Sequence, residues 1–526
     1  MAMESHSFIA GALDFRLVAL PTVFIAYIAF KAFEGRRRPA GVPYPPGPRP
    51  LPIIGNLLDI PLEYAWKNYA EWAKTYGDTI SLTFLGQVIV ILNSPKAARD
   101  LLDKRSATYS ARPPVPFYDL MGWGWFVPTA QYDDVWRAKR KVLDFGLRPN
   151  VAIQYQPMQR AKARDFLKTL ASSPENFREH IEHFQGAIVM STVYDYDVKA
   201  HGDRYLEAAI EMSKLGARTV MPGAVLVNHL PMLRHLPEWL PGTGFKKLAR
   251  YGRSLGEEVR DTPFEYVKNR MRSGTARPSI TLVNLQELED IDSPDSEEAL
   301  RLIAAATGSL YPGIASADTT VSAMTSFFLM LVLYPDVQKK AQAELDAVTG
   351  RTRLPDFSDR ARLPYTEAIC KELIRCRVVT PLGAPHAATQ DDVYNGYFIP
   401  KGALVVANSW AMLHDPDVYP DPETFQPERY LTKDGQVKAD PTLSVAFGFG
   451  KRACPGRHLV DTTLFIVVSS VLSVFTVGKA KDDQGDEIPV DSMPTGALVS
   501  HPKPFKCSIT PRDTKAEQLI AGVQPD

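Results

Sequence analysis

Residues 447–456 read Phe-Gly-Phe-Gly-Lys-Arg-Ala-Cys-Pro-Gly and place a cysteine, Cys454, inside a short glycine-rich loop. An apolar run from Leu459 to Val471 follows directly, so we predict that a helix begins just behind the loop. Backbone N–H groups of such a loop and helix start can point at the sulfur and stabilise a thiolate. The pattern therefore predicts that Cys454 is a metal ligand or a nucleophile. The alternative is a small buried apolar side chain.

The composition excludes several classes of protein. The 526 residues are 45% hydrophobic and 23% charged, which is typical of a globular chain and not of a disordered one. Sixty basic and sixty acidic residues balance, so no global charge favours nucleic acid, and we expect none as a partner. The four cysteines form no CxxC pair, which argues against a disulfide framework and a structural zinc site.

The spacing Phe-x-x-Gly-x-Arg-x-Cys-x-Gly resembles, over its full length, the haem-binding loop of the cytochrome P-450 family. The resemblance implies that Cys454 is the axial ligand of the iron in haem b (iron protoporphyrin IX). It also implies that Phe447 and Gly456 belong to the cofactor-binding loop and that Arg452 binds a haem propionate. The chain is most similar to the fungal microsomal branch, such as enzymes resembling O-methylsterigmatocystin oxidoreductase.

Further motifs of the family follow in the expected order. Trp136 and Arg140 lie one helical turn apart and resemble the pair that grips a haem propionate. His386 stands where many relatives have an arginine, so the resemblance implies a propionate contact whose strength depends on protonation.

A second set of residues resembles the structural centre of the family. Glu372 and Arg375 match its Glu-x-x-Arg motif, in which positions i and i+3 of a helix share a face. Arg429, within Phe-Gln-Pro-Glu-Arg-Tyr, matches the arginine that joins this pair. Taken alone, each of these patterns is also typical of an ordinary ion pair.

Residues 315–320 read Ala-Ser-Ala-Asp-Thr-Thr and resemble the oxygen-activation motif of the family. An acid beside an alcohol can hold a water and pass protons, so the resemblance implies catalytic roles for Asp318 and Thr319. By themselves these residues are also typical of a polar patch on a helix. Ser316 departs from the glycine usual at its position, which leaves open how closely the helix approaches the haem.

The predicted fold is mainly α-helical with small β-sheets. Residues 80–92 suit a hairpin around Gly86, and residues 393–406 carry two more strand signals. A long helix is predicted from just after Ser293-Pro294 to Leu333, with a kink caused by a proline and glycines inside it. The resemblance, which covers residues 40–510, implies the cytochrome P-450 fold, a triangular helical prism.

The N-terminus is predicted to be a membrane anchor. Residues 17–33 are almost wholly apolar, and three arginines at 36–38 follow, so the positive-inside rule places the N-terminus in the lumen. The alternatives are a cleaved signal peptide and a buried core helix. We therefore predict a luminal end, anchor and basic stop at 1–38, a proline-rich hinge at 39–52 and a single haem-binding catalytic domain at 53–526. The protein is predicted to be a single-pass protein of the endoplasmic reticulum membrane with a cytosolic catalytic domain.

The resemblance implies a haem-thiolate monooxygenase that inserts one oxygen atom of O2 into a small lipophilic substrate. Because the chain has no GxGxxG fingerprint, electrons are expected from NADPH through a membrane-bound cytochrome P-450 reductase. Alternatives are a reductase-independent enzyme that uses hydroperoxides and a non-catalytic haem sensor or carrier. A basic strip formed by Arg137, Lys139, Arg140 and Lys141 is a candidate docking site for the reductase, although some of these side chains are expected to face the haem. A solvated helix face is the other interpretation.

The substrate is expected to be lipophilic. The aromatic stretch 116–126 aligns with a substrate-contact region of the family, although such a run is more often core packing. Residues 221–240 are rich in Leu, Val and Pro and are predicted to dip into membrane lipid. A terpenoid or other secondary metabolite, a sterol-like molecule and a polycyclic aromatic or other xenobiotic all fit.

Overall fold

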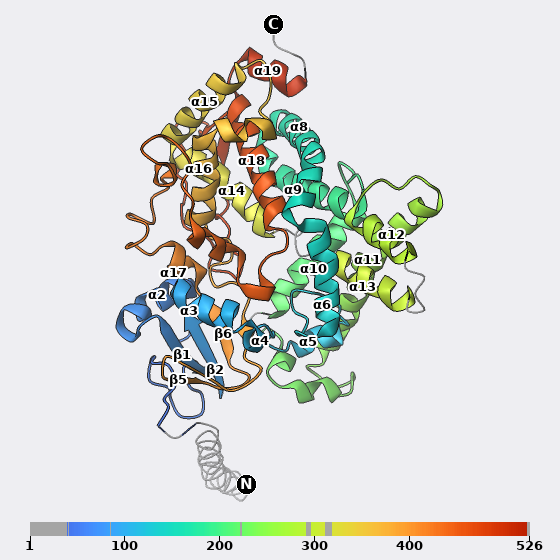
Figure 1. Cartoon of the computed structure of the whole chain (residues 1–526), viewed down its shortest axis with the longest axis vertical. Helices are drawn as coiled ribbons and strands as arrows, with labels where there is room; N and C mark the ends of the chain where they lie inside the picture. Colours follow the sequence, from blue (N-terminus) through green and yellow to red (C-terminus); the bar gives the residue numbers. More distant parts are fainter. Residues whose placement is uncertain are drawn as a thin grey trace, which may run out of the picture. The chain divides into compact units, whose positions relative to one another are not determined.

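The computed structural model describes residues 39, 41–84, 86–220, 224–290, 296–310 and 318–522, with the backbone alone at 289, 290, 296 and 318. Its contacts divide the chain into two compact units (Figure 1). Unit 1 contains the described residues up to Ala111 together with Pro385–Asn408, and unit 2 contains Arg112–Ala384 and the chain from Ser409 onward. The range predicted as one catalytic domain, 53–526, includes parts of both units. The predicted membrane anchor at 17–33 lies outside the described residues.

Unit 1 is built on a sheet with the strand order β1-β2-β6-β3. The predicted hairpin is confirmed, because β1 (Thr79–Phe84) and β2 (Gln87–Leu92) pair antiparallel. A parallel strand, β6 (Leu404–Ala407), continues the sheet beside β2, and β3 (His386–Ala387) pairs antiparallel with β6. The other elements of this unit are a second hairpin, β4 (Asp392–Tyr394) with β5 (Tyr397–Ile399), the helices α2 (Ala65–Tyr76), α3 (Pro95–Ala98) and α4 (Ser106–Tyr109), and the π-helix η1 (Arg99–Lys104).

The proline-rich segment is extended, as predicted, and it is bound to unit 1 along its length. The Pro43 carbonyl accepts a hydrogen bond from the Phe398 amide at 2.7 Å, and the Pro46 carbonyl accepts one from the Ser81 amide at 2.9 Å. Gly47 is required by this close approach, since a Cβ there would lie 2.1 Å from the Ser81 carbonyl oxygen. The segment from residue 43 is therefore part of the folded body.

Unit 2 is mainly helical. Its central helix is α18 (Arg457–Val474), which is apolar on every side and buried from Thr462 onward, as expected for a helix surrounded by others. It packs against α8, α15 and α16, while α9 packs on α8 and α14 (Figure 1). The helices are α5 (Pro116–Leu120), α6 (Asp134–Leu147), α7 (Pro149–Ala152), α8 (Gln156–Ser172), α9 (Phe177–Tyr194), α10 (Arg204–Val220), α11 (Gly244–Arg272), α12 (Ile280–Asp290), α13 (Ser296–Leu310), α14 (Asp318–Leu333), α15 (Pro335–Thr349), α16 (Pro364–Cys376), α17 (Ser409–Leu413), α18 and α19 (Thr514–Ala521), with one hairpin of β7 (Phe475–Lys479) and β8 (Cys507–Pro511).

The predicted long helix corresponds to α13 and α14. Its two ends lie where the sequence places them. Of the residues expected to kink it, Gly308 lies within α13, while Pro312 and Gly313 lie outside the described residues, as does Ser316. Among the described residues one helix, α18, is long and apolar enough to cross a membrane, and 78% of its window is buried in the core. Helices α14 and α15 pass the same test only as a pair bent by 103°.

The aromatic stretch 116–126 forms α5 and a loop that packs into the core of unit 2. Phe117 and Trp123 are buried, and the Trp123 indole N–H donates to the Gly252 carbonyl at 2.8 Å. Glycines make room for this ring: a Cβ on Gly256 would lie 2.5 Å from Trp123 Nε1, and one on Gly216 would lie 3.2 Å from the ring. Core packing against α10 and α11 is therefore the main role of Trp123.

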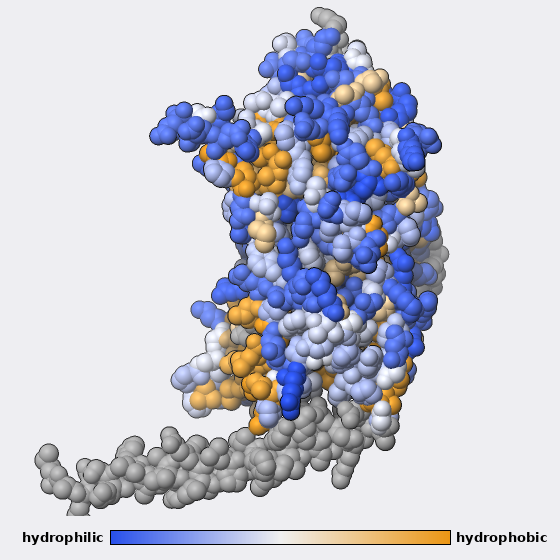
Figure 2. Space-filling model, turned by 90° about the vertical axis from the view of Figure 1, so that its left-hand side faces the viewer, coloured by the Kyte–Doolittle hydropathy of each residue, from blue (hydrophilic) through white to orange (hydrophobic). Residues whose placement is uncertain are grey.

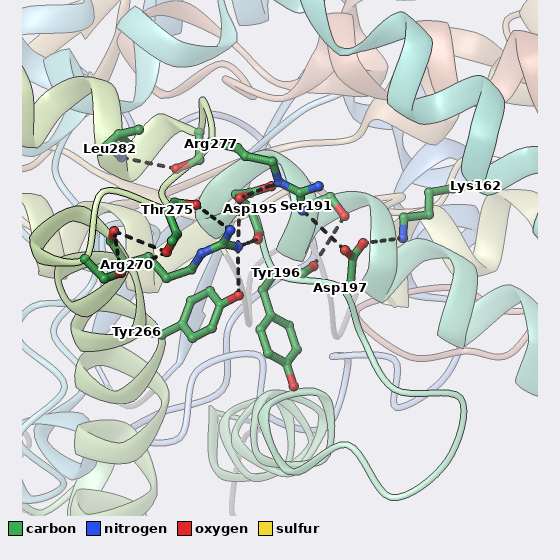
Figure 3. Close-up of polar contacts among 12 residues, drawn as sticks. Lys162, Ser191, Asp195, Tyr196, Asp197, Tyr266, Arg270, Thr275, Arg277 and Leu282 are labelled. Carbon is green, nitrogen blue, oxygen red and sulfur yellow. Dashed lines mark hydrogen bonds and ion pairs between the residues drawn. The ribbon is translucent and has the colours of Figure 1, made fainter.

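An ion-pair network ties the end of α9 to the end of α11 (Figure 3). Asp195, in the left-handed region with φ 52°, accepts hydrogen bonds from Arg270 at 3.0 Å and from Arg277 at 2.9 Å. Lys162 on α8 binds Asp197 at 2.8 Å, and Arg277 also reaches Asp197. These contacts pair the charges with one another and fix the chain between the helices. Figure 2 shows one face of the molecule, which is largely hydrophilic with apolar side chains in small patches.

Candidate active site

The loop that carries Cys454 has the predicted form. Gly448 and Gly450 adopt positive φ angles of 77° and 52°, which lets the chain fold back so that the Cys454 amide donates to the Phe447 carbonyl at 2.8 Å. Helix α18 begins at Arg457, directly behind the loop, as predicted. Burial raises the pKa of the Cys454 thiol, while hydrogen bonds from the backbone N–H groups of Gly456 and Arg457 lower it. The half-buried sulfur thus faces oriented donors, and a bound cation would complete its stabilisation as a thiolate.

Three guanidinium groups of unit 2 gather next to this loop. Arg140 on α6 donates to the Ala453 carbonyl at 2.7 Å, so it reaches the residue before the cysteine. Arg452 donates to the Val127 and Ala130 carbonyls at 3.3 and 2.7 Å. Burial, and to a smaller extent the charges of Arg112 and Arg140, together lower the pKa of Arg452 to about 9. Arg140 and Arg452, predicted separately as propionate ligands, therefore lie close to each other at a strongly positive place.

Arg112 is a site residue that sequence reasoning missed. Its guanidinium donates to the Pro128 carbonyl at 3.0 Å and to the Ala384 carbonyl at 2.7 Å, and burial lowers its pKa to about 10. In the sequence it is an arginine followed by two prolines, a context that predicts an extended backbone and gives no sign of burial.

Trp136 supports the site through its ring. Arg452 stacks on the Trp136 ring with its Cζ 4.2 Å from the centroid, and Tyr132 packs against the same indole at 5.2 Å. The indole N–H donates to the Val127 carbonyl at 3.1 Å, the oxygen that Arg452 also binds. In this arrangement Trp136 acts on the site by positioning Arg452.

The predicted basic strip on α6 is divided between inside and outside. Lys139 is buried, with 6% of its surface exposed, and Arg140 is directed to the cysteine loop. Arg137 and Lys141 remain on the exposed part of the helix surface. Of the four residues of the strip, only Arg137 and Lys141 are therefore exposed, in keeping with the expectation that some of them face inward.

His386 belongs to unit 1 and lies on β3, where it is buried. Its Nδ1 lies 2.7 Å from the Tyr109 carbonyl oxygen. Since a carbonyl can only accept, Nδ1 carries a hydrogen, and Nε2 can donate to an anion only when the ring is protonated.

The Glu-x-x-Arg residues form the predicted cluster within unit 2. Arg375 makes two hydrogen bonds to Glu372, at 2.7 and 2.8 Å, and Arg429 Nε donates to Glu372 Oε1 at 3.0 Å. Arg375 also donates to the Leu413 carbonyl at 2.9 Å, which joins α16 to α17. The three residues therefore form a buried ion-pair cluster with a structural role.

The predicted oxygen-activation residues lie at the start of α14. Asp318 is its first residue, but its side chain is outside the described part of the chain. Thr319 follows and is half-buried. No cluster of three or more His, Cys, Asp or Glu side chains suited to a metal ion occurs among the described residues.

A sequence model of the family described as Cytochrome P450 matches residues 45–509. The chain belongs to the cytochrome P450 family. Cytochrome P450 monooxygenase claR of Ampulloclitocybe clavipes is 43% identical over 489 residues, which are 92% of this chain and 89% of that protein. Cytochrome P450 monooxygenase COX1 of Coprinopsis cinerea is 39% identical over 513 residues, 96% of this chain and 98% of that one. Cytochrome P450 monooxygenase ple1 of Rhodocybe pseudopiperita is 42% identical over 482 residues, 90% and 91% of the two chains.

These relatives show what kind of enzyme this cytochrome P450 is. It is a haem-dependent oxidoreductase, a monooxygenase that incorporates oxygen with the help of a redox partner. Its mainly helical fold with small sheets agrees with the family.

Proposed function

We propose that this cytochrome P450 inserts one oxygen atom of O2 into a small lipophilic substrate with electrons from NADPH, delivered by a membrane-bound cytochrome P450 reductase. Cys454 is the proposed axial ligand of the haem iron. The observation that carries the assignment is the half-buried Cys454, whose sulfur accepts from backbone N–H groups of its loop beside the guanidinium groups of Arg112, Arg140 and Arg452. When bound, the haem supplies the redox chemistry that activates dioxygen.

The charges of the site fit this cofactor. Burial, and secondarily the neighbouring charges of Arg112 and Arg140, lower the pKa of Arg452, so an anion bound here would stabilise its charged form. The two propionates of haem b are anions of the right kind to pair with these arginines, because guanidinium groups bind carboxylates through directed N–H donors. We assign propionate binding to Arg112, Arg140 and Arg452. Trp136 positions Arg452, and His386 remains a proposed contact in its protonated form.

The chain's own groups would handle protons at the start of α14. We propose that Asp318 and Thr319 hold a water and deliver protons to the oxygen-binding side, as an acid and an alcohol in adjacent positions can. Glu372, Arg375 and Arg429 have a structural role, because they lie in a buried ion-pair cluster. Phe447 contributes the carbonyl that accepts from the Cys454 amide, and Gly456 contributes an N–H to the sulfur.

Membrane attachment is part of the proposal. Residues 17–33 would anchor the protein in the endoplasmic reticulum membrane, with the catalytic domain in the cytosol. In unit 2, three apolar side chains support lipid contact: Leu226, Met232 and Trp239 are 62%, 74% and 80% exposed. A lipophilic substrate, such as a terpenoid, another secondary metabolite or a polycyclic aromatic, would reach such an enzyme from the bilayer.

The ligand assignment is tested by Cys454→Ala. The full chain with this change should lose the thiolate-type carbon monoxide spectrum, whereas Cys507→Ala, a matched change of a cysteine in β8, should keep it. A Cys454→Ala protein that retains the thiolate spectrum contradicts the assignment.

The reaction itself is tested in microsomes that contain the enzyme and a reductase. A panel of terpenoids, steroids and polycyclic aromatics should give a product with one added oxygen that depends on NADPH. Turnover that needs only a hydroperoxide, and no reductase, would contradict the proposed electron source.

Thr319→Ala should uncouple oxygen consumption from product formation, and unchanged coupling would remove Thr319 from the proton relay.

A further inference from the structure

A cleft of about 990 Å³ opens within unit 2 between α6, α11 and α13. Helix α13 packs against both α6 and α11 (Figure 1). The lining combines charged side chains with the apolar faces of Trp125, Val135 and Phe264. Its volume is in the range that holds a small organic molecule.

Most charges that line the cleft are paired with a neighbour on their own helix. Arg260 binds Asp261 at 2.6 Å, Lys268 binds Glu265 at 2.8 Å, and Arg301 binds Glu297 at 2.6 Å. The remaining carboxylate, Glu298, is exposed. The remaining cation is Lys139.

Lys139 is the unusual member of this lining. It is 94% buried, and its ammonium group donates to the Trp125 carbonyl at 3.3 Å. Within the described part of the chain it forms no ion pair, and Asp133 supplies the opposing charge that it senses, from a distance. An ammonium group has three donors and is costly to bury without an anion, so this site is electrostatically incomplete.

The side chains around Lys139 indicate which kind of ligand could pair with its buried ammonium group. Trp125 supplies both the carbonyl partner and an aromatic surface, and Arg260 lies over that ring at 5.8 Å. Phe264 and Val135 extend the apolar lining. A single negative charge beside apolar surface is the complement of one buried ammonium beside aromatic rings.

From this geometry we infer that the cleft is a ligand site for an amphipathic carboxylate, with the carboxylate on Lys139 and the apolar body on Trp125, Phe264 and Val135. The site is separate from the cysteine loop. Lys139 and Arg140 leave α6 in directions about 100° apart, and Arg140 turns to the Ala453 carbonyl. A ligand there would join α6, which carries Trp136 and Arg140, to α11 and α13.

The test is calorimetric titration of the full-length haem-loaded protein in non-ionic detergent. The probe is 2-naphthoate, and the neutral probe of the same shape is 2-naphthamide. Saturating 1-phenylimidazole, whose nitrogen ligates haem iron, keeps the haem pocket filled. We expect one naphthoate to bind per chain and naphthamide to bind at least about tenfold more weakly, because a charge-assisted hydrogen bond is lost.

Lys139→Met should weaken naphthoate binding at least about tenfold, while Lys141→Met, the same change on the exposed part of α6, should leave it unchanged. If Lys139→Met does not fold, Val135→Trp serves instead, because residue 135 lines the cleft, is 47% exposed and can fill the mouth without a change of charge. Val135→Trp should also abolish binding. Equal binding by the Lys139 and Lys141 variants overturns the inference, as does binding that 1-phenylimidazole prevents. The titration measures no turnover, so its outcome is independent of the proposed reaction.

Discussion

Glu372 and Arg375 are both fully buried, and their side chains meet across one turn of α16 through two hydrogen bonds of 2.7 and 2.8 Å. Glu372 also accepts from Arg429 and from the Gln426 amide, so one carboxylate holds two guanidinium groups and a backbone N–H. Losing that charge would leave two cations poorly compensated in the protein interior. A buried pair contributes little beyond its desolvation cost while intact, yet its disruption is expensive.

Glu372→Gln should therefore destabilise the enzyme by about 3–5 kcal/mol. We expect a thermal unfolding midpoint lower by about 5 °C or more and a reduced yield of haem-loaded protein. The matched control is Glu71→Gln, since Glu71 and Lys74 have the same i, i+3 spacing on α2 but are 67% and 72% exposed. That change should shift the midpoint by less than about 1 °C. Equal shifts in the two variants would show that burial of the Glu372 pair is not decisive.

Arg112→Met should accelerate haem loss. If Arg112 binds a propionate, the variant loses charge-assisted hydrogen bonds, and transfer of haem to an apomyoglobin trap should become about tenfold faster or more. Arg164→Met removes an exposed arginine on α8 and should leave the rate unchanged. An Arg112→Met protein that holds haem as well as the parent would remove Arg112 from the site.

Gly256→Ala should destabilise unit 2 by about 1–3 kcal/mol, because the new Cβ would lie 2.5 Å from the rigid Trp123 ring. Gly244→Ala is the control on the same helix, where nothing lies within 4 Å of the added Cβ. That variant should be as stable as the parent or slightly more stable, since alanine favours a helix. Thermal unfolding of both variants measures the difference, and a neutral Gly256→Ala would mean that Trp123 can move.

The stability of the protein should fall in acid through Asp359. Hydrogen bonds from Arg353, opposed in part by burial and aided by the Asp356 amide, lower the pKa of Asp359 from 3.8 to about 2. A lowered folded-state pKa stabilises the protein above the unfolded value, and this contribution is lost as the pH falls through the folded value. About 2 kcal/mol should disappear between pH 4 and pH 2.

Asp359→Asn should be less stable than the parent at neutral pH and should show a shallower loss between pH 4 and pH 2, measured by unfolding midpoints over this range. Asp336→Asn, at a carboxylate that is 84% exposed, should keep the parent's slope. Identical slopes for the parent and Asp359→Asn would show that other groups control this window.

Local signals made much of the site predictable. The glycines before Cys454 and the apolar run after it define the loop and the helix without any distant contact. The hairpin around Gly86 and the faces shared by Glu372 and Arg375 depend on neighbours a few residues away.

Residues whose role depends on distant contacts were not predictable in this way. Arg112 is buried by carbonyls 16 and 272 residues away, and its sequence context reads like a surface loop. Some side chains of the basic strip were expected to face inward, and the i+3 spacing of Lys139 from Trp136 places it near the buried face of α6. The glycines that admit Trp123 have a function only once α10 and α11 are in place.

The attachment of the proline segment also sets the length of a tether. If residues 17–33 anchor the chain, the first residue fixed to unit 1 is Pro43, whose carbonyl is held by Phe398. Nine residues, 34–42, then separate bilayer and body, and even a fully extended chain of that length spans only about 30 Å. With that anchor, the connection would be shorter than a folded domain is wide, and it would keep the β-sheet of unit 1 close to the lipid headgroups throughout the catalytic cycle.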